Sequence, residues 1–318
     1  MLDAIGGYFE LEVLASGRHY HERAERLNTA RNCLEYIVLA RSPKRIYVPY
    51  YTCDVVMDVL NRHSLEIVRY HIDEVFEPER QYELKDGDLF LYINYFGLKA
   101  KAVAALASAY KAKLVVDNSQ AFFCPPIAGV DTFYSARKFF GVADGAYLYT
   151  NKKLDMRLEQ DVSYLRMAHL LKRIDVSAES GYKDFSENED LLKGERLKRM
   201  SKLTERILGS INYERAREKR TENFSFLDSQ LSGSNGFHLA RADDDVPMVY
   251  PYLCSAKPDR EKLLQARIYT SQYWRSVVEM RGVSDFEKKI VENTIFCPID
   301  QRYDESHLRN VASEVRGL

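Results

Sequence analysis

Short apolar runs alternate with amphipathic stretches in the first half of the chain. The runs are rich in Val, Ile, Leu and Tyr, and they predict β-strands at 45–48, 66–70, 88–94, 113–117, 132–135 and 146–150. Between them, apolar residues at helical spacing predict helices at 54–63, with Thr52 as N-cap, and at 99–111. This alternation indicates an α/β fold with a mostly parallel sheet covered by helices. Ligands bind such sheets at the carboxyl ends of the strands.

The pattern changes after Asn151. We expect a helix at 152–173, a polar connection at 177–190, and two long charged helices at 191–208 and 213–231. The last part mixes a loop, two strands and two helices, predicted at 232–236, at 246–254 and 294–300, after Pro258 and from Asp304. The sequence therefore predicts a large α/β domain over 1–208 and a small α+β lobe over 209–318.

Positive and negative charges nearly balance along the 318 residues, with 46 Lys and Arg against 47 Asp and Glu. This balance argues against nucleic acid or a membrane surface as a partner. The first residues, MLDAIGGYFELEV, place an acidic side chain where a signal peptide has a basic region, and no apolar run approaches the ~18 residues of a membrane span. The five cysteines are odd in number and form no C-x-x-C pair. We therefore expect a reduced, cytoplasmic protein.

Metal and nucleotide motifs are weak in this sequence. His19 and His21 would share a face on a strand and could chelate a metal, but no third ligand cluster follows them. Residues 243–245 are three aspartates without the spaced ligands of a calcium loop. Neither G-x-x-x-x-G-K-[ST] nor G-x-G-x-x-G occurs. We therefore expect no metal, no P-loop and no dinucleotide site.

Two predicted strand ends place reactive side chains close together. The stretch VVDNSQAF ends a strand with Asp117 and continues to Gln120, and FYSARKFF ends another with Ser135 and Lys138. The separation of 138 − 117 = 21 residues allows one connection and one further strand. Both ends can therefore meet at the same edge of the sheet.

Pyridoxal phosphate needs four groups that these strand ends offer. A lysine amine forms an imine with its aldehyde, and a carboxylate keeps its pyridine nitrogen protonated. An anion site holds the phosphate, and a hydrogen-bond donor aligns the 3-oxygen. Lys138 and Asp117 can supply the first two groups, and Ser135 and Gln120 can contribute to the others. A carboxylate about 4 Å from a pyridinium contributes roughly 4 kcal/mol at an effective dielectric of about 20, which keeps the ring protonated at neutral pH.

The stretch RLNTARNCLEYIVLA predicts a helix whose N-terminus completes the phosphate site. Asn28 or Thr29 is the expected N-cap, which leaves the N–H groups of Ala30 and Arg31 free to bind an anion. The Arg31 guanidinium can add a charge-assisted bond. Taken singly, these features have simpler explanations, since an aspartate at a strand end commonly forms a turn and a lysine beside aromatic residues commonly lies on the surface.

Four segments in this order resemble motifs of the DegT/StrS family of sugar aminotransferases, which are fold-type I pyridoxal-phosphate enzymes. They are VPYYTCDVV, INYFGL, VVDNSQAF and SARKFFGVADGAYLYT, and LNTARNCL is similar to the phosphate segment of the family. The resemblance is close from about Asn28 to Asn151 and looser beyond, where TIFCPIDQRYDESHLRNVASEV resembles the closing strand and helix. It implies a homodimer with the active site at the interface. It also implies transfer of an amino group from glutamate to a keto group on a nucleotide-linked sugar, for polysaccharide biosynthesis.

The resemblance also implies a role for each site residue. Lys138 would form the imine and then move the proton between substrate carbon and cofactor. Asp117 would face the pyridine nitrogen, and Gln120 the 3-hydroxyl. The phosphate would be bound by Ser135, Thr29, Ala30 and Arg31. Cys53 stands where many members have the residue that stacks on the ring, and the neighbouring Tyr51 can take that role. A lysine at this place argues against the dehydratase branch of the family, which has histidine there.

The sequence also departs from the family pattern. The usual His-x-Tyr-Gly is Asn-Tyr-Phe-Gly at 94–97, and the usual final Gly-Gly is Gly145-Ala146. The segment that lends an Asn to the neighbouring subunit's phosphate is not recognisable, although RMSKL at 199–203 resembles its end. Two alternatives therefore stay open: a pyridoxal-phosphate protein of the same fold with different amine chemistry, and a non-catalytic scaffold or regulatory member.

Overall fold

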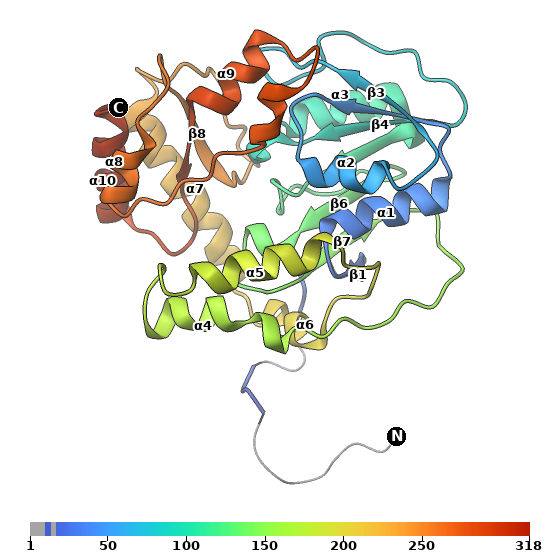
Figure 1. The fold of residues 1–318 in the computed structure, drawn as a ribbon, viewed down its shortest axis with the longest axis horizontal. Helices are drawn as coiled ribbons and strands as arrows, with labels where there is room; N and C mark the ends of the chain where they lie inside the picture. The colour runs from blue at the N-terminus through green and yellow to red at the C-terminus, as the bar shows by residue number, and fades with distance from the viewer. Residues whose placement is uncertain (1–9, 14–16) are drawn as a thin grey trace.

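A mixed β-sheet forms the centre of the protein (Figure 1). The computed structural model describes residues 10–13 and 17–318, and in this part seven strands pair in the order β1-β7-β6-β5-β4-β2-β3. The strands β2 to β6 run parallel to one another, whereas β7 is antiparallel to both of its neighbours. The bounds are β1 (Glu25–Leu27), β2 (Arg45–Pro49), β3 (Glu66–Tyr70), β4 (Asp88–Ile93), β5 (Leu114–Asp117), β6 (Asp131–Ser135) and β7 (Ala146–Tyr149). The predicted α/β class with a mostly parallel sheet is confirmed.

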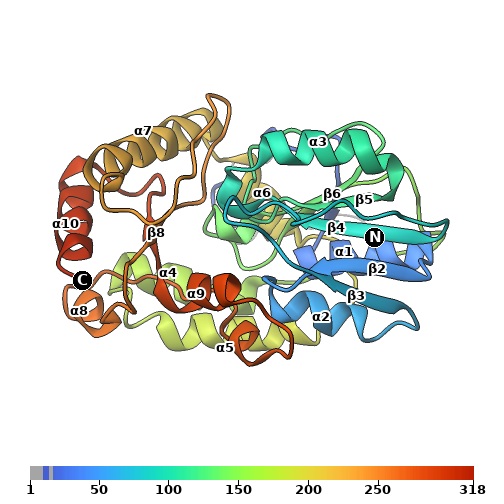
Figure 2. The same ribbon diagram turned by 90° about the horizontal axis from the view of Figure 1, so that it is seen from above.

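Helices cover both faces of this sheet, with α3 on one face and α1 and α2 on the other (Figure 2). Helices α4, α5 and α6 follow β7 and lie beside β1 and β7 (Figure 1). None of the helices within 10–13 and 17–318 is long and apolar enough to cross a membrane. The bounds are α1 (Ala30–Arg41), α2 (Asp54–Leu60), α3 (Ala100–Tyr110), α4 (Ala168–Asp175), α5 (Tyr182–Lys193) and α6 (Lys202–Gly209).

Strand β4 shows why the strand sequences are apolar without a break. Leu89 and Leu91 pack in the core on the side of α1, whereas Phe90 and Tyr92 pack in the core on the side of α3. Successive side chains of a strand point to opposite faces, and both faces of this sheet are covered. A continuous apolar run was therefore the correct signal for a central strand.

A second, smaller unit lies at one side of the sheet, on the left in Figures 1 and 2. It contains a two-stranded antiparallel sheet with helices packed around it, which confirms the predicted α+β character of the C-terminal part. Its elements are α7 (Tyr213–Leu231), β8 (Val249–Leu253), α8 (Arg260–Gln265), α9 (Asp285–Asn293), β9 (Thr294–Pro298) and α10 (Glu305–Arg316). The domain limits 1–208 and 209–318 stay a prediction.

The region after β7 differs from the predicted pattern of helices. The prediction of one helix at 152–173 is wrong for most of its length, since α4 begins only at Ala168 after a short 3₁₀ turn, η4 (Tyr164–Arg166). The prediction of a polar connection at 177–190 is wrong, because α5 begins at Tyr182. The prediction of one long helix at 191–208 is also wrong, because residues 194–201 separate α5 from α6.

Residues 196–200 are not helical, and they lie against the edge strand β1. The N–H of Asn28 donates to the carbonyl of Lys198 at 3.0 Å. The N–H of Met200 donates to the carbonyl of Arg26 at 3.1 Å. These bonds cover an otherwise open sheet edge. Because they join residues far apart in the chain, local periodicity contains no sign of them.

Helix α2 begins differently from the prediction. The predicted N-cap Thr52 is wrong: Cys53 occupies the cap position and makes no side-chain cap hydrogen bond. Thr52 is fully buried, and its hydroxyl finds no partner in the described part of the chain.

A buried ion pair fastens α1 to β6. Arg41, in the last turn of α1, donates to Asp131 through Nε at 2.7 Å and through Nη2 at 2.9 Å. The side chain of Asp131 is 1 % exposed and that of Arg41 is 16 % exposed. Both groups are taken out of water, so the pair is stable only while both partners are present.

Replacing Arg41 with Met leaves the buried Asp131 carboxylate without its partner. We expect Arg41→Met to lower the free energy of unfolding by about 3–5 kcal/mol, measured by urea denaturation. The control is Arg173→Met, because Arg173 is exposed and its side chain forms no hydrogen bond or ion pair with a described residue. This variant should change stability by no more than about 0.5 kcal/mol. Equal stability of the two variants would contradict the role of the pair.

Candidate functional site

The predicted site residues lie at the carboxyl edge of the large sheet. Asp117 ends β5, and Ser135 ends the neighbouring strand β6, where Asp117 pairs with Phe133. Lys138 ends the 3₁₀ turn η3 (Ala136–Lys138), which follows β6 directly. The parallel strands therefore bring Asp117, Ser135 and Lys138 to one edge.

Asp117 is a buried carboxylate, 8 % exposed. One of its oxygens accepts a hydrogen bond from the Ser119 N–H at 2.7 Å. Among the described residues, no cation lies within ion-pair distance of it. Burial raises the pKa of the Asp117 carboxyl, and the Lys138 ammonium works against that rise. The carboxylate thus lacks the direct cationic partner that buried charges require.

Lys138 is exposed, and it is the cation whose charge acts on the Asp117 carboxylate. Its ammonium makes no hydrogen bond and no ion pair with any residue that the structure describes. Lys138 also acts on Cys53, where burial raises the pKa of the thiol and the ammonium lowers it. Lys138, Asp117 and Cys53 therefore share one electrostatic environment, and their roles in a cofactor site stay a prediction.

Gln120 is oriented by the backbone that follows β4. Its Oε1 accepts from the Phe96 N–H at 2.8 Å, while its Nε2 finds no partner within the described residues although the side chain is 1 % exposed. The backbone here is tight: a Cβ on Gly97, which has φ +77°, would meet the Gln120 carbonyl oxygen at 2.9 Å. The hydrogen bond from Phe96 fixes the side-chain amide of Gln120 and leaves its buried Nε2 available as a donor.

The N-terminus of α1 offers an anion site. Thr29, one of the two predicted N-caps, accepts the Asn32 N–H on its hydroxyl at 3.2 Å. Within the part of the chain described, the N–H groups of Ala30 and Arg31 have no acceptor. Free amides at a helix start bind anions. The Arg31 guanidinium is partly engaged elsewhere, since its Nη1 donates to the Leu192 carbonyl at 2.6 Å.

Arg137 is a further cation next to Lys138, and it is not among the predicted site residues. It precedes Lys138 on η3, pairs with Glu189 of α5, and keeps its Nε without a partner in the described structure. Burial, together with the nearby Arg31 cation, lowers the pKa of Arg137 to about 10. Two guanidinium groups thus lie near each other by the start of α1. The sequence signal that could have identified Arg137 is its position as a charged residue inside the mostly apolar stretch FYSARKFF.

The turn at Asp144 and Gly145 connects these elements. Asp144 is fully buried and accepts from the Ser201 N–H at 2.8 Å and the Ser201 hydroxyl at 2.7 Å. The Gly145 N–H donates to the Asn28 carbonyl, and the Gly145 carbonyl accepts from Ala136 at 3.1 Å. The turn therefore joins η3, which ends in Lys138, to Asn28, which precedes the N-cap of α1.

Tyr51 lies at the border between the two sheets. Its ring stacks on Tyr95 with ring centroids 5.8 Å apart. It also packs edge-on against Trp274, with ring centroids 4.4 Å apart. Tyr51 is fully buried, and its hydroxyl has no partner among the residues described. A stacking role for Tyr51 or Cys53 stays a prediction.

The two histidines considered as metal ligands bond to the protein itself. His19 Nδ1 lies 2.6 Å from the Tyr147 hydroxyl, and His21 Nε2 lies 2.8 Å from the Phe122 carbonyl. Burial lowers the pKa of each histidine to about 4. The described residues contain no group of three or more His, Cys, Asp or Glu side chains that could hold a metal ion.

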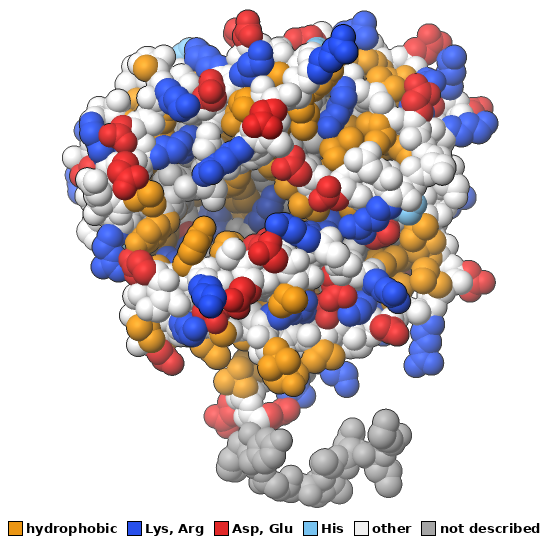
Figure 3. Space-filling model, viewed as in Figure 1, with side chains coloured by type: hydrophobic (Ala, Val, Ile, Leu, Met, Phe, Trp, Pro, Cys, Tyr) orange, Lys and Arg blue, Asp and Glu red, His pale blue; other side chains and the backbone are white. Residues whose placement is uncertain are grey.

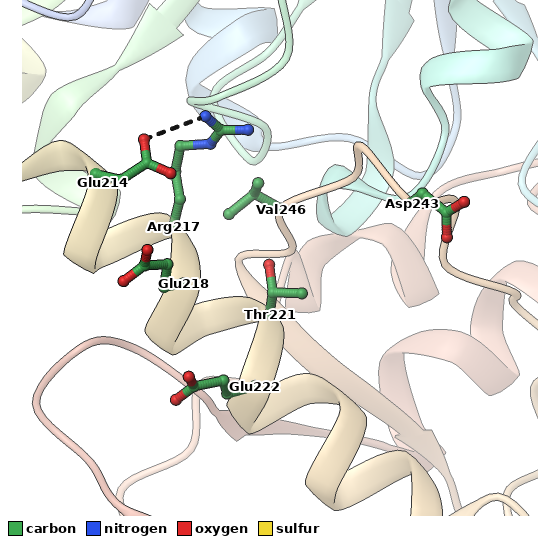
Figure 4. A pocket seen from close by; sticks show the side chains of 7 residues that line it. All are labelled: Glu214, Arg217, Glu218, Thr221, Glu222, Asp243 and Val246. Atoms are coloured by element: carbon green, nitrogen blue, oxygen red, sulfur yellow. Dashed lines mark ion pairs between the residues drawn. The ribbon is translucent and has the colours of Figure 1, made fainter.

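The surface is hollowed near the middle of the face in Figure 3, with Lys and Arg side chains beside the hollow. In Figure 1 this place lies between α2, α5, α7 and α9. A separate depression of about 310 Å³ lies between α7 and the loop before β8 (Figure 4). Its lining is mostly acidic and includes Glu218, Glu222 and Asp243. This depression contains none of the predicted site residues. The candidate site is therefore identified by the contacts and charges of its residues, and not by this depression.

Comparison with solved structures finds many chains of this fold. CalS13 from Micromonospora echinospora, a sugar aminotransferase, has a TM-score of 0.63 at 17 % identity, over 93 % of this chain and 87 % of its own. A DegT/DnrJ/EryC1/StrS aminotransferase from Brucella abortus has a TM-score of 0.60 at 13 % identity. The match covers 92 % of this chain and 85 % of that one. Spr1654 from Streptococcus pneumoniae, in its PLP form, has a TM-score of 0.63 at 13 % identity. The match covers 93 % of this chain and 88 % of that one. The predicted fold-type I architecture is confirmed.

Sequence comparison gives no comparable match. No protein-family model matches the chain, and no curated protein matches it.

The shared environment of Lys138 and Cys53 can be tested by alkylation. Because the Lys138 cation lowers the pKa of the Cys53 thiol, Lys138→Met should raise that pKa and leave less reactive thiolate. We expect iodoacetamide to label Cys53 about threefold more slowly at about pH 8, measured by peptide mass spectrometry. The exposed Lys152→Met is the control and should leave the rate unchanged. An unchanged rate of Cys53 labelling in Lys138→Met would show that the Lys138 charge does not act on the Cys53 thiol.

Proposed function

We propose that this protein is a pyridoxal-phosphate-dependent aminotransferase. It would convert an amino acid, most simply glutamate, and a keto group on a nucleotide-linked sugar into a keto acid and an amino sugar. The observation that supports this most directly is a buried carboxylate, Asp117, in electrostatic range of an unpaired lysine, Lys138, at the carboxyl edge of the sheet. The fold shared with aminotransferases of known structure supports the same reaction class.

The residues present fit the cofactor. When bound, pyridoxal phosphate supplies an electron sink for the substrate amine. Asp117, buried without a direct cationic partner, would face the pyridinium nitrogen. The unpaired Nε2 of Gln120 would donate to the 3-oxygen. Spr1654, a chain of the same fold, has been solved in a PLP form and a PMP form.

The phosphate would lie at the start of α1. The N–H groups of Ala30 and Arg31 have no protein acceptor in the described structure, and they would bind its oxygens together with Ser135 and Thr29. The Arg31 and Arg137 cations lie close enough to repel each other. An anion between them would remove that repulsion, so the charge pattern favours a phosphate there.

Lys138 would hold the aldehyde of the cofactor and then move the substrate proton. Its ammonium is exposed and unpaired in the described structure, so it is free to change partners during turnover. The Asp144–Gly145 turn holds η3 against α1 and would keep the lysine in place. Proton transfer by a positioned side chain contributes about 10²–10⁴-fold to the rate.

A homodimer in the cytoplasm is part of the proposal. Exposed apolar side chains gather between 162 and 191, on and around α4 and α5, which lie at the lower side of Figure 1. Apolar patches of this kind commonly mark an interface with another chain. The residues are Val162, Tyr164, Leu165, Leu171, Ile174, Val176, Tyr182, Phe185 and Leu191.

Substitution of Lys138 tests the proposed reaction. Protein loaded with pyridoxal phosphate should absorb in the near-visible range and lose this band with borohydride. In Lys138→Ala the band should be absent, and amino transfer from glutamate to keto sugars should fall by roughly 10³-fold. Lys152→Ala is the matched control, because Lys152 is exposed, and it should behave as the wild type. A band of wild-type strength in Lys138→Ala would reject the assignment.

A further inference from the structure

A buried arginine of the smaller unit packs against the residue that follows Lys138. Arg220 of α7 is 1 % exposed, and the central carbon of its guanidinium lies 4.4 Å from the centroid of the Phe139 ring. Phe139 comes directly after Lys138 and caps the turn η3. Consecutive Cα atoms are about 3.8 Å apart, so a contact that fixes Phe139 also limits where Lys138 can lie.

The carbonyl oxygen of Phe139 accepts hydrogen bonds from the smaller unit. Gln301, which follows β9, donates to it through Nε2 at 2.9 Å. Nη2 of Arg220 lies 3.5 Å from the same oxygen, which is long for a hydrogen bond. Arg220 also donates through Nε to Oε1 of Gln301 at 3.2 Å. Because a guanidinium can only donate, this bond turns the amide NH₂ of Gln301 toward the Phe139 carbonyl.

The segment that contains Gln301 is fixed by the same helix. Asn223 lies one turn after Arg220 on α7 and is 4 % exposed. Its Nδ2 donates to the carbonyls of Ile299 at 3.1 Å and Tyr303 at 3.2 Å, on either side of Gln301. Helix α7 therefore holds both the backbone around Gln301 and its side chain.

Arg220 is also connected to the backbone that orients Gln120. Its Nη1 donates to the Met248 carbonyl at 3.0 Å. The Met248 N–H donates to the Phe96 carbonyl at 2.8 Å, and the Phe96 N–H donates to Gln120 at 2.8 Å. One guanidinium thus supports two of the predicted site residues, Gln120 and Lys138, through hydrogen bonds to their neighbours.

Arg220 is a buried cation without a carboxylate bonded to it. Asp300 pairs with Arg302, and its charge acts on Arg220 from beyond ion-pair distance. Burial is the largest of the effects that bring the pKa of Arg220 down to about 10, so the group stays charged at neutral pH. An apolar side chain would avoid the free-energy cost of burying this charge. The planar guanidinium, however, can hold several acceptors at fixed angles, which suits a group that positions other residues.

We infer that Arg220 and Gln301 of the smaller unit are positioning residues for Lys138. They hold the carbonyl that follows the lysine and so keep the lysine where it meets the aldehyde of the cofactor. They take no part in proton transfer. This inference rests on the proposed aminotransferase function and extends it: the large unit contains the reactive lysine, and the smaller unit fixes the turn on which it lies.

The rate at which the near-visible band appears tests this role. Pyridoxal phosphate is mixed with the cofactor-free protein in a stopped-flow spectrometer. Binding of pyridoxine 5′-phosphate, which has an alcohol in place of the aldehyde, is measured by calorimetry. Gln301→Met removes the bond to the Phe139 carbonyl and should slow the band by about three- to tenfold. Its affinity for pyridoxine 5′-phosphate should stay within about twofold of the wild type, because the ring and phosphate sites are intact.

Arg220→Gln is the second variant, and it removes support on both sides. It should slow the band by about tenfold or more and should also weaken binding of pyridoxine 5′-phosphate, because Gln120 loses its support. Tyr250→Phe is the matched control. Tyr250 is 2 % exposed, and its hydroxyl donates to Asp228 of α7 at 3.3 Å and to no residue of η3. This control should form the band at the wild-type rate.

The two measurements separate this inference from the proposed function. Absence of the band in the wild type would reject the aminotransferase, and the positioning role with it. A band that forms at the wild-type rate in Gln301→Met would overturn the positioning role alone, even where Arg220→Gln fails to fold. An equal loss of rate and of pyridoxine 5′-phosphate affinity in Gln301→Met would also overturn it, because a general structural effect changes both.

Discussion

The structure of the candidate site depends on a carboxylate that is buried without a cation bonded to it. Asp117 lies at the end of β5, among strands that are covered on both faces, and burial raises the pKa of its carboxyl. Such a group is unfavourable in the folded protein unless a positive charge comes to it. Lys138 provides part of this charge from the next strand, and a pyridinium ring would provide the rest. In the proposed function, binding of a cationic ring would offset the free-energy cost of burying this carboxylate.

A second place near the site also favours a ligand of opposite charge. At the start of α1, free N–H groups and the neighbouring Arg31 and Arg137 cations favour an anion. In the proposed function, the buried Asp117 carboxylate would suit the ring of the cofactor, and the start of α1 would suit its phosphate.

Local sequence patterns were sufficient for the central part of this picture. Continuous apolar runs predicted the strands, and the ends of two runs placed Asp117 and Lys138 at one edge, because parallel strands end on the same side. The helix that follows predicted Asn28 or Thr29 as the N-cap of α1, and Thr29 occupies that position. The paired segment 196–200 and helix α5 were not predictable, because their conformation depends on contacts with distant residues.

The central claim is that Lys138 is the residue that holds the cofactor. The most direct measurement is peptide mass mapping of the whole protein after loading with pyridoxal phosphate and reduction with borohydride, which fixes the cofactor on its lysine. The account predicts the added mass on the peptide that contains Lys138 and on no other. A label on a different lysine, or no label at all, would contradict it.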